Sequence, residues 1–572
     1  MNAPTAALVA PRPERLRLVG QRRQILSTMH QRLMLAMLVF AGVVALITLR
    51  ILYLAAFGDH AGSRPGVSAL VPDRGDIVDR DGQPLARTID AWSIGLHPNK
   101  VIGDKLDLAR RLAQLMPERS QADYFAMLRS GKRFFYLRRR ASPDLVEAVN
   151  SIGEPGLSLN REPERLYPQT TLASSVVGYT DIDGRGVAGA ERAFDKVLSD
   201  PATRGRPIQL SISNRIQQAL ENELMSALRT FSAIGAAGIV MDIRTGEILA
   251  MTSLPQLNPN AAGQGSPEAR FNRATLGVYE LGSTFKPFTL AMAMDSGIVE
   301  SMGKTYNCPK ALRVGRFTIT DTHPFGGPCT IPEIMKESSN IGMAQIAAEV
   351  GAARQKAFLG KMGFLKPVEV ELMERGRTLT PGNNWGDIAT MTVGYGHGIA
   401  VTPLHLATGY ATLFNGGIYR PATLLKVGPG HPLAKGRRVF TADTSYKMRA
   451  LLRLVVTDGT GKKADAPGYR VGGKTGTAEK LAGGRYTSAA VITTFAGVFP
   501  MDDPRYVIVV MLDDPKATAE TYGFHTAGWN VAPVVSKTVS RIAPMLGVTP
   551  DRNREPDLSE VLPFVRDRPK AE

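Results

Sequence analysis

The order of apolar and polar positions separates one long apolar stretch near the start of the chain from a mixed remainder. Residues 33–49 carry no charge and are almost wholly apolar, and after Arg50 the residues 51–57 are apolar again. A helix of roughly 20 apolar residues crosses a bilayer, so the extended stretch is sufficient, with Arg50 reaching toward the interface. The pattern predicts one transmembrane helix over 33–57, and no second stretch of that length follows it.

The 32 residues before this helix contain six arginines and a single acidic residue, Glu14. Such an excess holds a segment in the cytoplasm, so residues 1–32 are predicted to be a cytoplasmic tail, with the main body beyond the membrane. The alternative is a cleaved signal peptide. The arginine-rich lead is too long for one, the apolar stretch exceeds a typical signal core, and no clear A-x-A site follows.

Turn signals and helical periodicity mark a first domain over residues 58–207. Asp81-Gly82 is a strong hairpin-turn signal. Residues 104–130 place leucines near a 3.6-residue period and are predicted to be helical, as is a shorter segment over 140–152. The polar run at 203–207 is a plausible boundary.

Beyond residue 207 the pattern predicts a second domain over 208–545, with an amphipathic helix first, two buried strands next, and a third buried strand and a helix near the end. These elements are expected at 216–228, 236–242, 248–252, 507–512 and 530–545. Strands from both ends of a domain with helices between them predict one sheet with helices on its faces, an α/β (α+β) fold. Residues 546–572, rich in Pro, Arg, Asp and Glu, are predicted to be a mobile tail.

Composition adds a strong positive charge and a low cysteine content. A net charge of +17 is compatible with nucleic acid, an anionic membrane surface or an acidic polymer. Nucleic acid ranks last, because no Lys/Arg run is interleaved with aromatic residues. The two cysteines, Cys308 and Cys329, exclude a disulfide-dense scaffold; they could form one disulfide in an oxidising compartment or remain two buried thiols.

Ser283-Thr284-Phe285-Lys286 carries the most informative candidate chemistry. Three residues along a helix bring two side chains to one face about one turn apart, so the hydroxyl of Ser283 and the amine of Lys286 would meet. The apolar run 288–294 predicts a buried helix behind them, whose N-terminus stabilises developing negative charge. Ser283 is therefore the predicted nucleophile and Lys286 its general base, provided that burial and a second cation depress the lysine pKa.

Ser338-Ser339-Asn340 follows further along the chain and would place a hydroxyl and an amide in one cleft. Ser338 could pass a proton between the base and a leaving amine, and Asn340 could hydrogen-bond a substrate amide as both donor and acceptor. Taken alone, the same residues fit a turn or the N-cap of a helix equally well.

Lys474-Thr475-Gly476-Thr477 is predicted to be an extended edge beside Ser283. Gly476 would let a peptide approach the backbone, and the three side chains around it offer donors for a substrate carboxylate. The backbone N–H groups of Thr477 and Ser283 could form an oxyanion hole, and Lys474 could be the second cation. Ser-x-x-Lys, Ser-x-Asn and Lys-Thr-Gly in this order are the signature of penicillin-interacting serine acyltransferases.

A rival hypothesis comes from residues 468–475, which match the phosphate-binding pattern G-x-x-x-x-G-K-[ST] and would indicate a nucleotide hydrolase. Such a loop needs a buried strand before it and a helix after it, and neither is predicted here. No zinc-ligand spacing and no Gly-x-Ser-x-Gly elbow occurs, so other chemistries find little support in the motifs, and the eight histidines are interpreted as structural.

With these motifs in place, the chain resembles the class B penicillin-binding proteins, most of all the division-specific peptidoglycan D,D-transpeptidases of the FtsI type. Residues 74–82 resemble the first pedestal motif of that family, R-G-x-I-x-D-R-N-G, and residues 186–191 resemble its G-x-x-G-x-E. The resemblance implies an elongated α+β pedestal (dimerisation-type) domain and a serine β-lactamase-like transpeptidase domain with a central antiparallel sheet. It also implies a single-pass protein of the inner membrane, with a periplasmic catalytic domain, at the division septum.

The resemblance further implies the reaction. Ser283 would attack the carbonyl of the penultimate D-alanine of a stem peptide, release the terminal D-alanine, and pass the acyl group to an amine of a neighbouring strand. β-Lactams would acylate the same serine, and no metal or organic cofactor is implied. The implied partners are stem peptides, lipid-linked nascent glycan, an FtsW-type glycosyltransferase and other division proteins. An elongation-specific transpeptidase, a D,D-carboxypeptidase that uses water as acceptor, and an inactive penicillin-binding module remain as alternatives.

Overall fold

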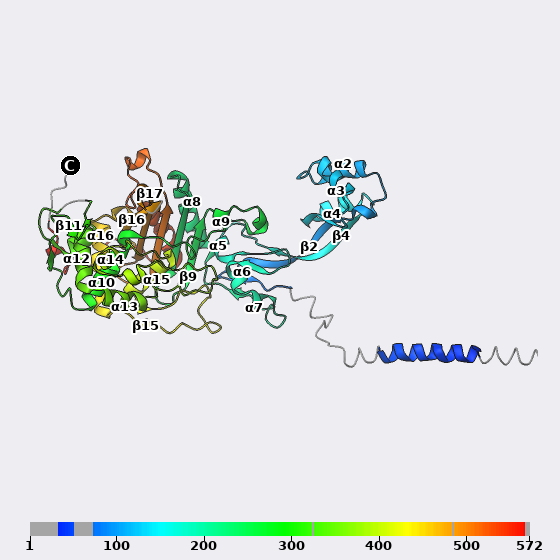
Figure 1. Cartoon of the computed structure of the whole chain (residues 1–572), viewed down its shortest axis with the longest axis horizontal. Helices are drawn as coiled ribbons and strands as arrows, with labels where there is room; N and C mark the ends of the chain where they lie inside the picture. Colours follow the sequence, from blue (N-terminus) through cyan, green and yellow to red (C-terminus); the bar gives the residue numbers. More distant parts are fainter. Residues whose placement is uncertain (1–31, 51–72, 323–324, 483–484, 567–572) are drawn as a thin grey trace, which may run out of the picture. The chain divides into compact units, whose positions relative to one another are not determined.

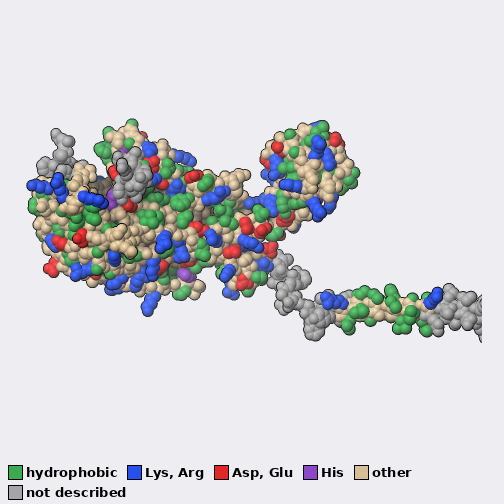
Figure 2. Space-filling view, viewed as in Figure 1, with side chains coloured by type: hydrophobic (Ala, Val, Ile, Leu, Met, Phe, Trp, Pro, Cys, Tyr) green, Lys and Arg blue, Asp and Glu red, His purple; other side chains and the backbone are tan. Residues whose placement is uncertain are grey.

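The computed structural model describes residues 32–50, 73–322, 325–482 and 485–566, and the chain divides into two units at Val71 (Figure 1). The first unit contributes one helix, Arg32–Arg50, which is long and apolar enough to cross a membrane. All of its residues are exposed, and its surface is mostly hydrophobic (Figure 2). This helix matches the first part of the predicted span 33–57; residues 51–57, and residues 1–31 of the predicted tail 1–32, lie outside the described residues.

The second unit begins with a sheet that carries helices on one end. Its strands are β1 (Ile77–Val78), β2 (Pro84–Leu96), β3 (Phe135–Ala141), β4 (Leu157–Leu166) and β7 (Ile208–Gln209), with β2 pairing with β1, β3 and β4. The predicted hairpin turn lies between β1 and β2, where Gly82 has a φ of +83° that favours glycine. This region is the described part of the first predicted domain.

The segment 104–130, expected as one helical stretch, forms two helices, α2 (Lys105–Leu115) and α3 (Gln121–Arg129). Pro117 and a capping box separate them: Ser120 accepts from the N–H of Asp123, whose side chain accepts from Ser120 in return. The short helix α4 (Pro143–Asn150) lies within the predicted 140–152. Together with β2 and β3 these helices enclose a small apolar core built around Ile94, Leu112 and Tyr124.

A buried ion cluster joins the two pedestal motifs. Glu191, in α6 (Gly189–Ala193), has no exposed surface, and its two carboxylate oxygens lie 2.7 Å from Arg74 Nε and 2.7 Å from Arg165 Nε. Arg74 also lies 2.7 Å from Asp195 Oδ1. Arg74 lies just before β1 and Arg165 lies in β4, so the carboxylate of Glu191 connects three parts of this domain.

The second predicted domain forms around a five-stranded antiparallel sheet in the order β16 (Gly472–Ala482), β17 (Arg485–Phe499), β18 (Tyr506–Asp513), β8 (Gly235–Asp242) and β9 (Ile248–Leu254). The predicted strands 236–242, 248–252 and 507–512 are therefore confirmed. Alternate side chains of β18 enter different cores: Val509 packs with α15 (Pro403–Phe414), and Val510 packs with α8 (Asn214–Thr230) and α17 (Val531–Ile542). Burial on both faces explains why these strands are continuous apolar runs.

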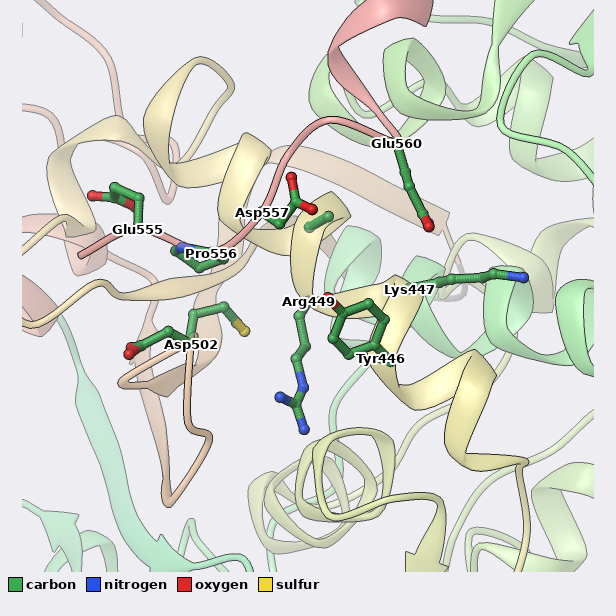
Figure 3. A pocket seen from close by; sticks show the side chains of 10 residues that line it. Tyr446, Lys447, Arg449, Asp502, Glu555, Pro556, Asp557 and Glu560 are labelled. Atoms are coloured by element: carbon green, nitrogen blue, oxygen red, sulfur yellow. The ribbon is translucent and has the colours of Figure 1, made fainter.

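The prediction of a mobile tail over 546–572 is wrong for its described part, residues 546–566. Val548 and Val561 are buried, and Glu555 lies 2.6 Å from Arg453 of α16 (Ala442–Thr457). The segment contributes Glu555, Asp557 and Glu560 to the lining of a cavity of about 210 Å³, whose other lining residues include Tyr446 and Arg449 of α16 (Figure 3). The charged composition suggested disorder because its partners lie far away in the sequence; residues 567–572 lie outside the described residues.

Cys308 and Cys329 form a disulfide in the structure, which decides between the two alternatives that the sequence left open. Both cysteines are buried, and the antiparallel pair β10 (Thr305–Tyr306) and β13 (Cys329–Thr330) lies beside them. The bond therefore closes the base of the segment 305–330.

The buried cluster around Glu191 generates a stability prediction. Glu191→Gln leaves Arg74 and Arg165 buried without a carboxylate between them, so the free energy of unfolding should fall by about 3–5 kcal/mol. Urea unfolding of the full chain measures the loss. The matched control is Glu118→Gln, which removes an exposed ion pair with Arg138 in the same domain and should cost less than about 1 kcal/mol. Equal stabilities of the two variants would contradict the role assigned to the cluster.

Candidate active site

Ser283 lies in a short 3-10 turn, η4 (Gly282–Phe285), that runs directly into the core helix α10 (Lys286–Asp295). The neighbours of the serine fix this turn: Thr284 Oγ1 donates to Leu281 O at 2.7 Å, and Tyr410 Oη donates to Thr284 O at 3.0 Å. Ser283 is the one residue of the turn that is not buried. The sequence-based placement at the start of a buried helix is therefore confirmed, with a 3-10 turn where a regular helix was expected.

The floor beneath the serine is aromatic. Phe285 and Phe288 pack edge to face at 5.3 Å between ring centroids, and both contact Phe364. Phe288 also packs against Tyr410. Because this cluster is fully buried, it gives α10 a fixed position and excludes water from the inner side of the site.

Lys286 is fully buried, and its amine meets the second motif. Nζ donates to Asn340 Oδ1 at 2.8 Å and to Ser338 Oγ at 3.1 Å, and it also contacts the carbonyl oxygen of Ser338. Ser338 has a φ of +63°, and Asn340 begins α12 (Asn340–Val350). The structure thus brings together Lys286, Ser338 and Asn340, which are far apart in the sequence.

Burial holds the pKa of Lys286 well below its ordinary value, and the positive charge of Lys474 lowers it further, against the opposing charge of Asp321. Burial also lowers the pKa of Lys474, to about 7, against the charge of Glu337. These are the two causes that the sequence analysis required for a lysine base. Both shifts favour loss of the proton from these amines at pH values where an exposed lysine stays charged.

Lys474, Thr475, Gly476 and Thr477 lie in β16, which is an edge strand of the sheet as predicted. Lys474 Nζ donates to Thr475 O at 3.1 Å, and Thr475 Oγ1 lies 2.8 Å from Thr460 Oγ1. Thr477 Oγ1 accepts from the N–H of Ala527 at 3.1 Å.

The structure explains why position 476 is a glycine, for a reason that the sequence did not reveal. A Cβ atom at this position would lie 2.4 Å from Leu281 O and 3.1 Å from Thr284 N. The absent side chain therefore lets the turn that carries Ser283 lie against β16. The sequence predicts that a substrate peptide approaches the backbone at Gly476. In the structure, the backbone of the turn η4 makes this close approach.

The nucleotide-hydrolase hypothesis for residues 468–475 is wrong. Lys474 and Thr475 lie inside β16, which continues to Ala482, so no helix follows the motif. A phosphate loop needs that helix, because its N-terminal N–H groups bind the phosphates.

Two charged groups near the site were not identified from the sequence. Asp321 accepts hydrogen bonds from the segment that holds Ser338 and Asn340. His397, interpreted from the sequence as structural, lies within electrostatic range of Lys286, and Glu280 Oε2 lies 3.7 Å from its Nδ1. Burial and the Lys286 charge lower the His397 pKa to about 4, so the imidazole is neutral at physiological pH. No local spacing signals either residue.

The described ranges contain no group of three or more His, Cys, Asp or Glu side chains arranged to hold a metal ion. The cavity of Figure 3 is lined by α16, the β17–β18 turn and the C-terminal segment, and it contains none of the residues above. The three predicted motifs come together where η4, α12 and β16 meet.

Two family models match the chain. The penicillin binding protein transpeptidase domain matches residues 236–536, and the penicillin-binding protein dimerisation domain matches residues 69–201. The probable peptidoglycan D,D-transpeptidase FtsI of Caulobacter vibrioides is 38% identical over 504 residues, covering 86% of this chain and 84% of that protein. Peptidoglycan D,D-transpeptidase FtsI of Escherichia coli K12 is 31% identical over 526 residues, covering 86% and 87%.

Solved structures agree with these relatives. Penicillin binding protein 3 of Mycobacterium tuberculosis in complex with aztreonam has a TM-score of 0.66 at 26% identity, covering 84% of this chain and 98% of that one. Its complex with ampicillin has a TM-score of 0.67 at 26% identity, covering 85% and 97%. From its two domains, its three motifs and these relatives, the chain belongs to the family of class B penicillin-binding transpeptidases.

Proposed function

We propose that this protein is a serine D,D-transpeptidase of the FtsI type that cross-links peptidoglycan stem peptides during septal cell-wall synthesis and is acylated by β-lactams. The observation that carries the proposal is the buried amine of Lys286, held by Ser338 and Asn340 at the first residue after the Ser283 turn. The curated relatives are named as peptidoglycan D,D-transpeptidases, and the structural neighbour was solved with two β-lactams.

The acylation step follows from the site. Neutral Lys286 takes the proton of Ser283 as Oγ attacks the carbonyl carbon of the penultimate D-alanine. The N–H groups of Ser283 and Thr477 stabilise the oxyanion. Ser338 passes the proton to the leaving amine, the C–N bond breaks, and terminal D-alanine departs with an ester left on Ser283.

Substrate binding uses the edge of the sheet. Lys474, Thr475 and Thr477 offer donors to the terminal carboxylate of the stem peptide, and Asn340 binds the substrate amide through its side chain. In the second half of the reaction, an amine of a neighbouring strand attacks the ester, and Ser283 is released with its proton restored. Water in place of the amine would give D,D-carboxypeptidase activity, so the exclusion of water decides the product.

Each region of the chain has a separate proposed role. We propose that residues 58–207 form the periplasmic pedestal and that residues 208–545 form the transpeptidase domain, with the anchor at 33–57 and the arginine-rich residues 1–32 in the cytoplasm. The site of action would be the division septum in the inner membrane, with an FtsW-type glycosyltransferase and other division proteins as partners and lipid-linked nascent glycan as the substrate strand.

Covalent labelling tests the nucleophile. Incubation of the full-length protein with penicillin should add one penicillin mass to the wild type and none to Ser283→Ala, because the hydroxyl that forms the ester is absent. Ser266→Ala is the matched control, since Ser266 only caps a short surface helix, and it should label like the wild type. Intact-mass spectrometry measures the adduct, and equal labelling of Ser283→Ala would remove the proposal.

Protease accessibility tests the membrane orientation. Protease added to spheroplasts should digest the main body and spare an epitope tag placed before residue 32, because the arginine-rich segment stays inside. Loss of the tag with an intact body would reverse the proposed topology.

A further inference from the structure

One segment of the transpeptidase domain reaches the active site without belonging to any of the three motifs. It runs from β10 to β13, its base is closed by the Cys308–Cys329 disulfide, and it carries the hairpin of β11 (Leu312–Val314) and β12 (Phe317–Ile319). Asp321 lies two residues after β12 and is half-buried. Two of the segment's residues, 323 and 324, lie outside the described ranges.

The carboxylate of Asp321 is occupied entirely by the Ser-x-Asn motif and the helix behind it. Oδ2 accepts from Ser339 Oγ at 2.6 Å, and Oδ1 accepts from the N–H groups of Asn340 at 2.5 Å and Ile341 at 3.1 Å. Ser339 Oγ in turn accepts from the N–H of Gly342 at 2.9 Å. The free N–H groups at the start of α12 are thus satisfied by one carboxylate and one hydroxyl.

The residue before Asp321 orients the amide of Asn340. Asn340 Nδ2 donates to Thr320 O at 3.2 Å, so its Oδ1 is the atom that faces Lys286 Nζ, at 2.8 Å. Ser338, whose side chain also accepts a hydrogen bond from Lys286, precedes Ser339, which donates to Asp321. The backbone of Ser338 adopts the left-handed conformation, which is uncommon for residues other than glycine. Both side chains that accept hydrogen bonds from the Lys286 amine therefore depend on Thr320 and Asp321 of this segment.

We propose that Asp321 is a positioning residue of the acylation reaction, which holds Ser338 and Asn340 against the Lys286 amine through Ser339 and the first turn of α12. The inference rests on the proposed nucleophilic role of Ser283 and deepens it. Asp321 does not touch the reacting atoms; it acts through the two side chains that do.

The negative charge of Asp321 acts on the pKa of Lys286, so its removal should change the pH dependence of acylation, which the loss of a purely structural helix cap would not do. Two charged groups act on Lys286: Lys474 from β16 lowers its pKa, and Asp321 raises it. His397, a neutral ring beside Glu280, also lies within electrostatic range of Lys286, and Glu337 acts on Lys474. Removal of the Asp321 charge leaves burial and Lys474 unopposed, so the pKa of Lys286 falls further and more of the amine is neutral at a given pH.

The test is the pH dependence of acylation of the full-length protein in detergent by a fluorescent penicillin, followed as a second-order rate constant from pH 5 to 10. Asp321→Asn keeps the size of the side chain and removes its charge. It should lower the maximal rate on the order of tenfold, because the acceptors of Lys286 lose their fixed positions. It should also move the acidic limb of the profile to lower pH.

The matched control is Asp295→Asn. Asp295 also serves a helix start, accepting from the N–H of Thr441 at 2.7 Å and from Thr444 Oγ1 at 3.2 Å, but it lies nine residues beyond Lys286 along α10. Its profile should match that of the wild type. Asp321→Glu keeps the charge and displaces the carboxylate, so its rate should fall while the acidic limb stays in place; this variant decides the question if Asp321→Asn does not fold.

A profile of Asp321→Asn that superimposes on the wild type would overturn the proposal. A loss of rate without movement of the limb would also overturn it, since a cap that acts only on folding cannot change the titration of Lys286. Failure of the proposed function looks different: in that case the wild type itself forms no adduct, or Ser283→Ala labels as the wild type does.

Discussion

The arrangement depends on one costly feature, a lysine amine buried within hydrogen-bonding distance of two neutral acceptors. Lys286 has no exposed surface, and Ser338 and Asn340 receive its hydrogen bonds. Burial disfavours the charged form, and the nearby cation Lys474 disfavours it further, which is what the proposed role of Lys286 as proton acceptor for Ser283 requires. The aromatic floor under α10 keeps this pocket dry and rigid.

The fold supplies that pocket from parts of the chain that are distant in sequence. The serine turn comes from the start of a core helix, the acceptors from the start of another, and Lys474 from the edge strand β16. The missing side chain of Gly476 lets the turn lie directly against that edge. The sheet, buried on both faces, fixes the edge, and the disulfide-closed segment fixes the acceptors through Asp321.

Local patterns predicted what local physics controls. Three strands of the sheet, the buried helix after Ser283 and the extended edge at Lys474 follow from apolar runs, Pro287 and glycine placement, whereas β17 was not predicted. Asp321 and the C-terminal segment 546–566 were not predicted, since each is defined by partners far away in the sequence: Asp321 by the start of α12, and Glu555 by Arg453. The break within segment 104–130 was not predicted, because the leucine periodicity continues across Pro117 and the capping box that separate α2 from α3.

The central claim is that burial and the charge of Lys474 hold the pKa of Lys286 well below its ordinary value, while burial lowers the pKa of Lys474 to about 7. Its most direct test is a pH titration of the full-length protein with ¹³C at the lysine Cε positions, with the two resonances assigned by Lys286→Arg and Lys474→Arg. One resonance should titrate at about 7, as for Lys474, and the Lys286 resonance should titrate well below the ordinary lysine value. Ordinary titration of both lysines near pH 10.5 would contradict the account.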